Sequence, residues 1–309
     1  MHDGASETSA ARWRRLRQAL AGLPPFRDSG GRYYLTRWVF LRLLGLIYLV
    51  AFVSYWVQVE GLVGSGGILP AEGLAQALRE HLGLKAYRVA PSLFWLYPHD
   101  AMLHILCGGG VALSVVLAAG LLPTLCLTLL WAFYLSLVTF SQDFLAFQWD
   151  SLLLEVGFLA VFFAPFQAVS RLERQAAPSL VMLWLLRLLT FRLMFGSGFV
   201  KLYDETWRTF TALLYHFETQ PLPTPVAWYA NQLPARFLEA ATFLTLFAEL
   251  TVPFFVFGTR RWRLVGFVIL AGFQALIMLT GNFAFFNWLS LVLCVLLLDV
   301  DHFKKVNDQ

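Results

Sequence analysis

The stretch TRWVFLRLLGLIYLVAFVSYWVQ, residues 36–58, decides the fold. It contains only two charged residues, Arg37 and Arg42, and it is otherwise mostly apolar. A helix needs about 20 mostly apolar residues to cross the hydrocarbon core of a membrane. The stretch is long enough to do so, and it therefore predicts a first membrane-spanning helix.

The composition extends this interpretation to the whole chain. Of the 309 residues, 59% are hydrophobic and only 14% are charged, and the mean hydropathy is +0.65. A soluble domain carries about 25% charged residues, so a water-soluble fold is excluded. Positive charge gathers at or before the first apolar run, at Arg12, Arg14, Arg15, Arg17, Arg27, Arg32 and Arg37. This position favours a cytoplasmic contact with the phosphate groups of membrane lipids and not with nucleic acid. The basic stretch before the first apolar run is long, and the apolar run has full length, so together they predict a signal anchor that is retained and not cleaved.

The hydropathy pattern predicts an all-α, polytopic bundle of about eight spans. They are expected near 36–58, 101–121, 124–141, 151–168, 179–201, 236–257, 262–280 and 284–299. This divides the chain into a basic cytoplasmic segment at 1–35, a transmembrane helical domain at 36–300 and a short tail at 301–309.

The charges of the connections give the bundle a direction. With the N-terminus inside, the inner connections and the tail carry Arg171, Arg174, Arg260, Arg261, Lys304 and Lys305. Asp143 and Asp150 fall on the outer side without a nearby Lys or Arg. Inner loops are generally the positive ones, so the eight-span count satisfies the rule without moving any span. In the first outer loop, Leu74, Leu78 and Leu82 recur every four residues, which predicts an amphipathic helix over 71–82 that lies in the interface or packs on the bundle.

The three cysteines, Cys107, Cys126 and Cys294, all fall in apolar runs and fit no zinc-binding spacing. We expect small buried side chains, with no metal and no cofactor. The chain lacks HExxH, Gly-x-Ser-x-Gly, Cys-x-x-Cys, P-loop and dinucleotide-binding patterns, which counts against common hydrolases, redox enzymes and ATPases. The sequence thus favours a protein that is not an enzyme.

Charged residues inside the spans are the first candidates for function, because a charge in a membrane is costly unless it is paired or faces a cavity. Arg192 lies near the middle of its span and is expected to pair with Glu155 or Glu249. Such a pair is either structural or part of a substrate site. In either case, removing Arg192 would leave a buried acid unpaired. Arg187 is expected to extend to the inner face and Lys201 to the outer face.

Two outer loops hold the other candidates. The first runs over 142–150 and contains Gln142, Asp143, Gln148, Trp149 and Asp150, of which Asp150 is expected to cap the next helix. The second loop, over 207–225, contributes Trp207, Tyr215, His216, Glu218, Gln220 and Pro221. His216 and Glu218 could act as an acid/base pair, bind a partner or substrate, or simply belong to an aromatic belt.

Several strings in these regions resemble the lipase maturation factor family. They are Tyr34–Arg37, Gly67–Pro70, Pro91–Phe94, Gln142–Asp150 with Leu154 and Glu155, Phe191–Gly198 and Thr211–Pro225. The strings QDFLAFQWD and TALLYHFETQPLPTP are long and unusual. The resemblance covers about two-thirds of the chain.

The resemblance implies a multi-pass membrane protein that helps a secreted lipase to fold and assemble. It also implies a distant likeness to the membrane part of vitamin K-dependent carboxylases. Members of the family usually continue into a soluble non-cytoplasmic C-terminal domain, which is expected to be absent here because the sequence ends at Gln309. The Ala-, Leu- and Arg-rich character favours a bacterial inner membrane, or the endoplasmic reticulum if the chain is eukaryotic.

Two functions from different classes follow. In the leading hypothesis the outer loops hold an exported client, a lipase, while it folds. In the alternative, a membrane-embedded enzyme acts on a lipid, a quinone or an exported peptide, with Arg192 and Glu155 in a polar cavity and His216 or Glu218 as acid or base. A transporter is a weaker third interpretation, because the sequence contains no visible pair of broken helices.

Overall fold

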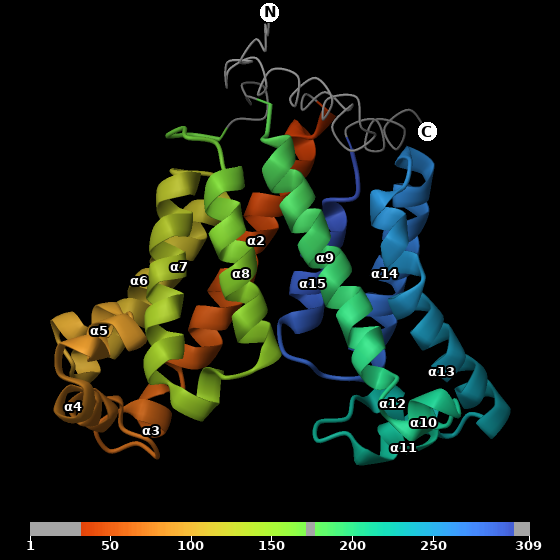
Figure 1. Ribbon diagram of the computed structural model, residues 1–309, viewed down its shortest axis with the longest axis horizontal. Coiled ribbons are helices and arrows are strands. Elements are labelled where there is room, and N and C mark those ends of the chain that lie inside the picture. The colour runs from red at the N-terminus through yellow and green to blue at the C-terminus, as the bar shows by residue number, and fades with distance from the viewer. Residues whose placement is uncertain (1–31, 171–176, 300–309) are drawn as a thin grey trace, which may run out of the picture.

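The computed structural model describes residues 32–170 and 177–299, and these ranges form a bundle of helices (Figure 1). They contain no strand, only an isolated bridge between Leu121 and Val169. The basic residues predicted at Arg12, Arg14, Arg15, Arg17, Arg27, Arg171, Arg174, Lys304 and Lys305 lie outside the described residues, as do the tail and nearly all of the segment 1–35.

Eight helical segments correspond to the eight predicted spans. In chain order they are α2 (Tyr34–Trp56), α6 (Asp100–Ala119), α7 (Pro123–Phe140), α8 (Gln148–Phe163), α9 (Leu180–Lys201), α13 (Ala235–Leu250) with η6 (Val252–Phe257), α14 (Arg260–Thr280) and α15 (Phe286–Val295). Six of these, all but α8 and α15, are long and apolar enough to cross a membrane. The prediction of an all-α transmembrane bundle is confirmed, and the chain is an integral membrane protein.

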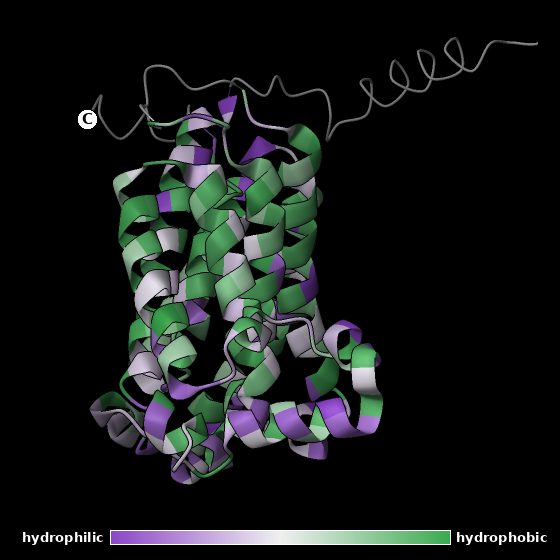
Figure 2. Ribbon diagram, turned by 90° about the vertical axis from the view of Figure 1, so that its left-hand side faces the viewer, coloured by the Kyte–Doolittle hydropathy of each residue, from purple (hydrophilic) through white to green (hydrophobic). Residues whose placement is uncertain are grey.

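The outer connections fold into short helices at one end of the bundle, which we call the outer end. One group follows α2 and comprises α3 (Val59–Val63), α4 (Ala71–Leu82), η2 (Gly83–Lys85), α5 (Ala86–Val89) and η3 (Leu93–Leu96). The other follows α9 and comprises α10 (Glu205–Arg208), α11 (Ala212–Thr219) and α12 (Pro225–Asn231). Hydrophilic residues gather toward this end, whereas the bundle itself is hydrophobic (Figure 2).

The amphipathic helix predicted over 71–82 is present as α4. Its small residues Ala71 and Ala75 are fully buried, and Leu74 and Leu78 pack partly buried against the core. The guanidinium of Arg79 lies 5.2 Å from the centre of the Trp95 ring. The apolar side of α4 therefore packs on the outer end of the bundle.

The first and last spans meet at the opposite, inner end. The hydroxyl of Thr36 in α2 donates a hydrogen bond of 2.9 Å to the carbonyl of Leu298, just after α15. An even number of spans between these two residues returns the chain to the side from which it started. The contact between Thr36 and Leu298 therefore agrees with the eight predicted spans. That this end faces the cytoplasm stays a prediction from the loop charges.

The core is apolar and includes the three cysteines. Cys107, Cys126 and Cys294 are buried and free of disulfides, as the sequence predicts. The bundle has two groups of spans, α2 with α6, α7 and α8, and α9 with α13, α14 and α15. They meet where α8 contacts α9 and α15 contacts α2 (Figure 1).

Candidate functional site

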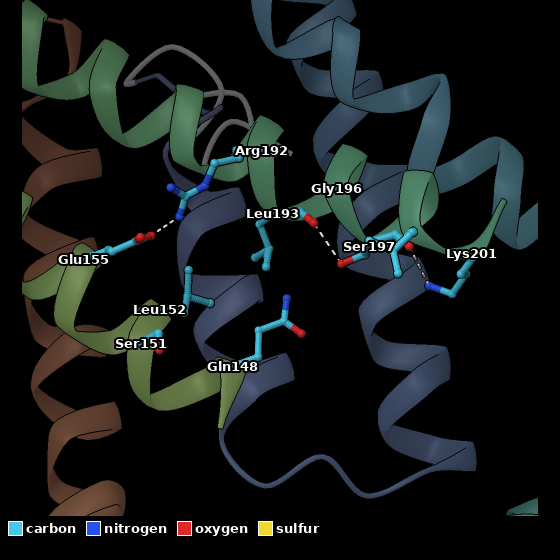
Figure 3. Close-up of a pocket in the computed structure, with 10 residues that line it drawn as sticks. Gln148, Ser151, Leu152, Glu155, Arg192, Leu193, Gly196, Ser197 and Lys201 are labelled. Carbon is cyan, nitrogen blue, oxygen red and sulfur yellow. Dashed lines mark hydrogen bonds and ion pairs between the residues drawn. The ribbon is translucent and has the colours of Figure 1, made fainter. Parts of the chain in front are cut away.

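A groove lies between α8 and α9 in the described part of the chain. It has a volume of about 520 Å³. Polar and apolar side chains alternate along it (Figure 3). The lining residues are Gln148, Ser151, Leu152 and Glu155 from α8 and Arg192, Leu193, Gly196, Ser197, Val200 and Lys201 from α9. Both walls thus include residues of the strings that carry the family resemblance.

The deep part of the groove holds an ion pair. Arg192 of α9 and Glu155 of α8 point toward each other across the groove, and the guanidinium Nη2 donates to a carboxylate oxygen (Figure 3). Their side chains are 62% and 43% exposed, respectively. Glu155 is therefore not the buried acid that the sequence predicts, because the groove opens beside it.

A second ion pair lies at the outer end of α9. The ammonium Nζ of Lys201 lies 2.7 and 2.6 Å from the two carboxylate oxygens of Glu249 in α13. Glu249 is almost completely buried, and Lys201 remains 24% exposed. Glu249 is thus the partner of Lys201 and not of Arg192, since α13 packs against the part of α9 nearest its outer end.

Two glycines of α9 explain how the helix contacts α13 on one side and borders the groove on the other. A Cβ atom added at Gly198 would lie 2.8 Å from the Cβ of Glu249, so the absence of a side chain permits the close approach. A Cβ added at Gly196 would meet nothing within 4 Å. Gly198 therefore allows two helices to meet closely, whereas Gly196 leaves space in the groove.

Arg187 and Asp150 both lie deeper than the sequence indicates. Arg187 does not extend out of the bundle: it is 1% exposed, and its Nε donates to the carbonyl of Leu296 at 2.9 Å. Asp150 is fully buried and accepts a hydrogen bond of 2.5 Å from the Tyr134 hydroxyl. It lies within the first turn of α8, because the extended Phe147 occupies the cap position. Asp150 therefore does not cap the helix and does not face the groove.

The rest of the loop over 142–150 lies at the outer end. The side chain of Gln142 donates to the carbonyl of Leu69 at 3.2 Å, which ties this loop to the first outer loop. Asp143 is exposed, and the ring of Trp149 stacks on that of Phe147 with centroids 4.6 Å apart. Of the residues predicted here, Gln148 alone lines the groove.

The candidates in the loop over 207–225 do not form one site. His216 and Glu218 are two residues apart on α11, so they point to different sides of that helix. No hydrogen bond or ion pair joins them in the described part of the chain, and the predicted acid/base pair is therefore not formed. Trp207 lies under the ammonium of Lys201, 5.1 Å from it, whereas Tyr215 is 57% exposed.

A small second pocket of about 110 Å³ lies between α11 and the connection to α15. It is lined by His216, Thr219, Gln220, Pro221, Leu222, Asn282 and Phe283. Gln220 donates to the carbonyl of Thr280 at 2.9 Å, which holds the loop against α14. Burial lowers the pKa of His216 from its ordinary value, and the positive charge of Lys201 lowers it further.

The sequence reasoning missed the polar residues that complete the groove, Ser151 and Ser197. A serine in an apolar run usually returns its hydroxyl to its own helix, as Ser197 does to the carbonyl of Leu193 at 2.8 Å, so it gives little signal. The sequence signal that could have indicated Ser197 is its position on the same helix as Arg192, five residues further along the chain. The described residues contain no group of three His, Cys, Asp or Glu that could hold a metal ion.

Comparison with known proteins gives a consistent family match. The family model of the lipase maturation factor transmembrane domain matches residues 35–305. Lipase maturation factor 2 of Xenopus laevis is 44% identical over 283 residues, which cover 88% of this chain and 40% of that protein. Lipase maturation factor 1 of Mus musculus is 38% identical over 278 residues, covering 87% of this chain and 48% of that protein.

Lipase maturation factor 1 of Homo sapiens is 36% identical over 282 residues, covering 88% of this chain and 49% of that protein. The chain thus spans less than half the length of each of these three relatives. No solved structure matches it.

Proposed function

Because this chain belongs to the lipase maturation factor family, we propose that it assists the folding and assembly of an exported client protein, a lipase, through its outer loops. The observation that carries this proposal is the match of the family's transmembrane domain over 35–305, which includes every span. The relatives are named for lipase maturation, and in this chain most of the family strings lie at the outer end or along the groove.

Residues of the outer end supply a surface for the client. Tyr215 and Asp143 are exposed there, together with Glu218 and Pro221. Aromatic side chains are typical anchors of protein interfaces, because they bury a large area at little cost in conformational entropy. In our proposal Tyr215 is one such anchor.

The proposal places the chain in the membrane across which its client is exported, with the outer end facing the compartment where the client folds. The three relatives described above are vertebrate proteins, so they give no support to the expected bacterial inner membrane and fit the endoplasmic reticulum of a eukaryotic cell. Localising the tagged chain in its native cell by fractionation distinguishes the two membranes.

The function is tested with a secreted lipase expressed in cells that contain or lack this chain. Lipase activity per mass of secreted protein is expected to fall when the chain is absent, because a lipase that has not folded correctly lacks a formed active site. Equal specific activity in both cells, for every lipase tried, would refute the proposal.

A matched pair of variants separates the outer end from the rest of the molecule. Tyr215→Ala is expected to lower the activity of the secreted lipase, whereas Phe166→Ala at the inner end is not. Both residues are exposed aromatics, 57% and 95% respectively. Equal effects of the two variants would show that the outer end has no special role.

The alternative prediction, a membrane-embedded enzyme acting on a lipid, a quinone or an exported peptide, receives no support from the comparisons, and we do not propose it.

A further inference from the structure

The groove extends from the outer end to near the middle of the membrane. At 1.5 Å per helical residue, Arg192 lies about 18 Å from the start of α9 at Leu180 and about 14 Å from its end at Lys201. A hydrocarbon core is about 30 Å thick, so Arg192 lies close to its middle. Whatever occupies the groove beside Arg192 is therefore surrounded by membrane.

The ion pair in the groove leaves hydrogen-bonding capacity unused. A guanidinium has five N–H donors. Within the described residues, Arg192 donates only to Glu155, and the other carboxylate oxygen of Glu155 accepts nothing. Lipid tails offer neither donors nor acceptors at this depth, and leaving such groups dry in hydrocarbon is costly. The occupant of the groove must therefore bring hydrogen-bonding groups to the middle of the membrane.

The charges of the groove compensate one another. Arg192 is paired with Glu155, and the ammonium of Lys201 is held by both oxygens of Glu249. An anionic lipid headgroup would find no unpaired cation here. An uncharged ligand with many polar groups fits better than a phosphate.

We propose that this groove binds an extended, uncharged polypeptide segment of the exported client, which enters from the outer end. The inference rests on the proposed function and names the site where the client is held. An extended chain advances about 3.3 Å per residue, so about four residues reach from Lys201 to Arg192. Its backbone supplies the carbonyl acceptors and N–H donors that Arg192 and Glu155 lack.

The walls of the groove suit such a segment. The side chains of Gln148, Ser151 and Ser197 lie along it as further hydrogen-bonding partners (Figure 3). Leu152 and Leu193 offer apolar contacts to client side chains between these polar groups. The lining reaches Gln148 at the start of α8 and Lys201 at the end of α9, so a segment can enter from the outer end.

Photo-crosslinking of the full chain in membranes tests the proposal. Ser151 is replaced by p-benzoylphenylalanine, and the variant is co-expressed with an epitope-tagged secreted lipase. The control carries the same substitution at Phe199, which is 46% exposed on the same span as Arg192 but does not line the groove. We expect severalfold more lipase adduct from position 151 than from position 199. Adducts with phospholipid alone at position 151, or equal lipase adducts at both positions, would overturn the proposal.

A second pair of variants tests the groove by filling it. Gly196→Leu places a side chain in the groove, and Gly272→Leu is the control, because an added Cβ meets nothing within 4 Å at either glycine. Gly196→Leu alone is expected to lower both the yield of adduct at position 151 and the specific activity of the lipase severalfold. Unchanged adduct and activity in this variant would contradict the proposal.

The two proposals fail in distinguishable ways. If removing the whole chain lowers lipase activity but no lipase adduct forms at position 151, the groove does not bind the client and the proposed function stands. If removing the chain leaves the activity of every lipase unchanged, the proposed function itself is refuted.

Discussion

Breaking the ion pair between Lys201 and Glu249 should cost far more stability than breaking the pair between Arg192 and Glu155. Removing one partner of a buried pair leaves a charge without compensation, at a cost of about 3–5 kcal/mol, whereas an exposed pair contributes about 0–1 kcal/mol. Glu249 is 6% exposed, but Glu155 is 43% exposed. Both glutamates pair with cations of the same span, so burial is the main difference.

The perturbation is Glu249→Leu, with Glu155→Leu as the matched control. Because Lys201 keeps 24% exposure, we expect the lower end of the range, about 3 kcal/mol, for Glu249→Leu. That value corresponds to a decrease of about 100-fold in the ratio of folded to unfolded protein, since 1.4 kcal/mol is a factor of ten. Glu155→Leu should cost about 1 kcal/mol or less.

The free energy of unfolding is measured in detergent by titration with a denaturing detergent, followed by circular dichroism. The double variant Lys201→Met/Glu249→Leu completes the test, because a buried ion pair replaced by apolar residues is often neutral or stabilising. It should recover most of the loss caused by Glu249→Leu. Equal costs of Glu249→Leu and Glu155→Leu, or a double variant no more stable than the single one, would refute the assignment of Glu249 as a buried, paired acid.

Three further predictions use the same molecule. Gly198→Ala should lower the free energy of unfolding by about 1–3 kcal/mol, because the added methyl group overpacks the contact with α13. Gly196→Ala is the control and should leave the free energy of unfolding unchanged, since an added Cβ there meets nothing within 4 Å. Equal losses of stability in the two variants, measured by unfolding in detergent, would contradict the prediction. Since burial gives His216 a lowered pKa in the folded protein, its contribution to stability is fully present above the ordinary pKa of about 6.5 and decreases as the pH falls through the folded pKa. His216→Gln should therefore reduce the loss of stability between pH 7.5 and 5.5, as measured by thermal unfolding, and an unchanged pH profile would count against it. In oriented membranes, a membrane-impermeant maleimide should label Tyr215→Cys and Arg261→Cys from opposite sides of the membrane. The background labelling should be low, because the native cysteines are buried. Labelling of both variants from the same side would overturn the topology.

The positions of the spans could be predicted closely because the physics that sets them is local. Each helix satisfies its own backbone hydrogen bonds in the membrane, so a run of apolar residues of sufficient length is nearly enough to define one. The structure begins α9 at Leu180 and ends it at Lys201, against a predicted span of 179–201. The amphipathic helix α4 was predicted with the same bounds that the structure has, since its leucines follow the helical period.

The partners of the charged residues could not be predicted in this way. Spacing along the chain limits Arg192 to Glu155 or Glu249 but does not choose between them, because the choice depends on which helix packs beside each turn of α9. In the same way, the depth of Arg187 depends on the carbonyl of Leu296, 109 residues away in sequence. His216 and Glu218 are close in sequence, yet the helical geometry of α11 turns them apart.

By itself, the sequence determined that this chain is a membrane protein with about eight helical spans and that its polar outer loops carry the family strings, because hydropathy and charge act residue by residue. Only the tertiary structure decided that Arg192 pairs with Glu155 beside an open groove, while Lys201 pairs with the buried Glu249. The physical reason is that burial and pairing depend on how helices distant in sequence turn and pack against one another.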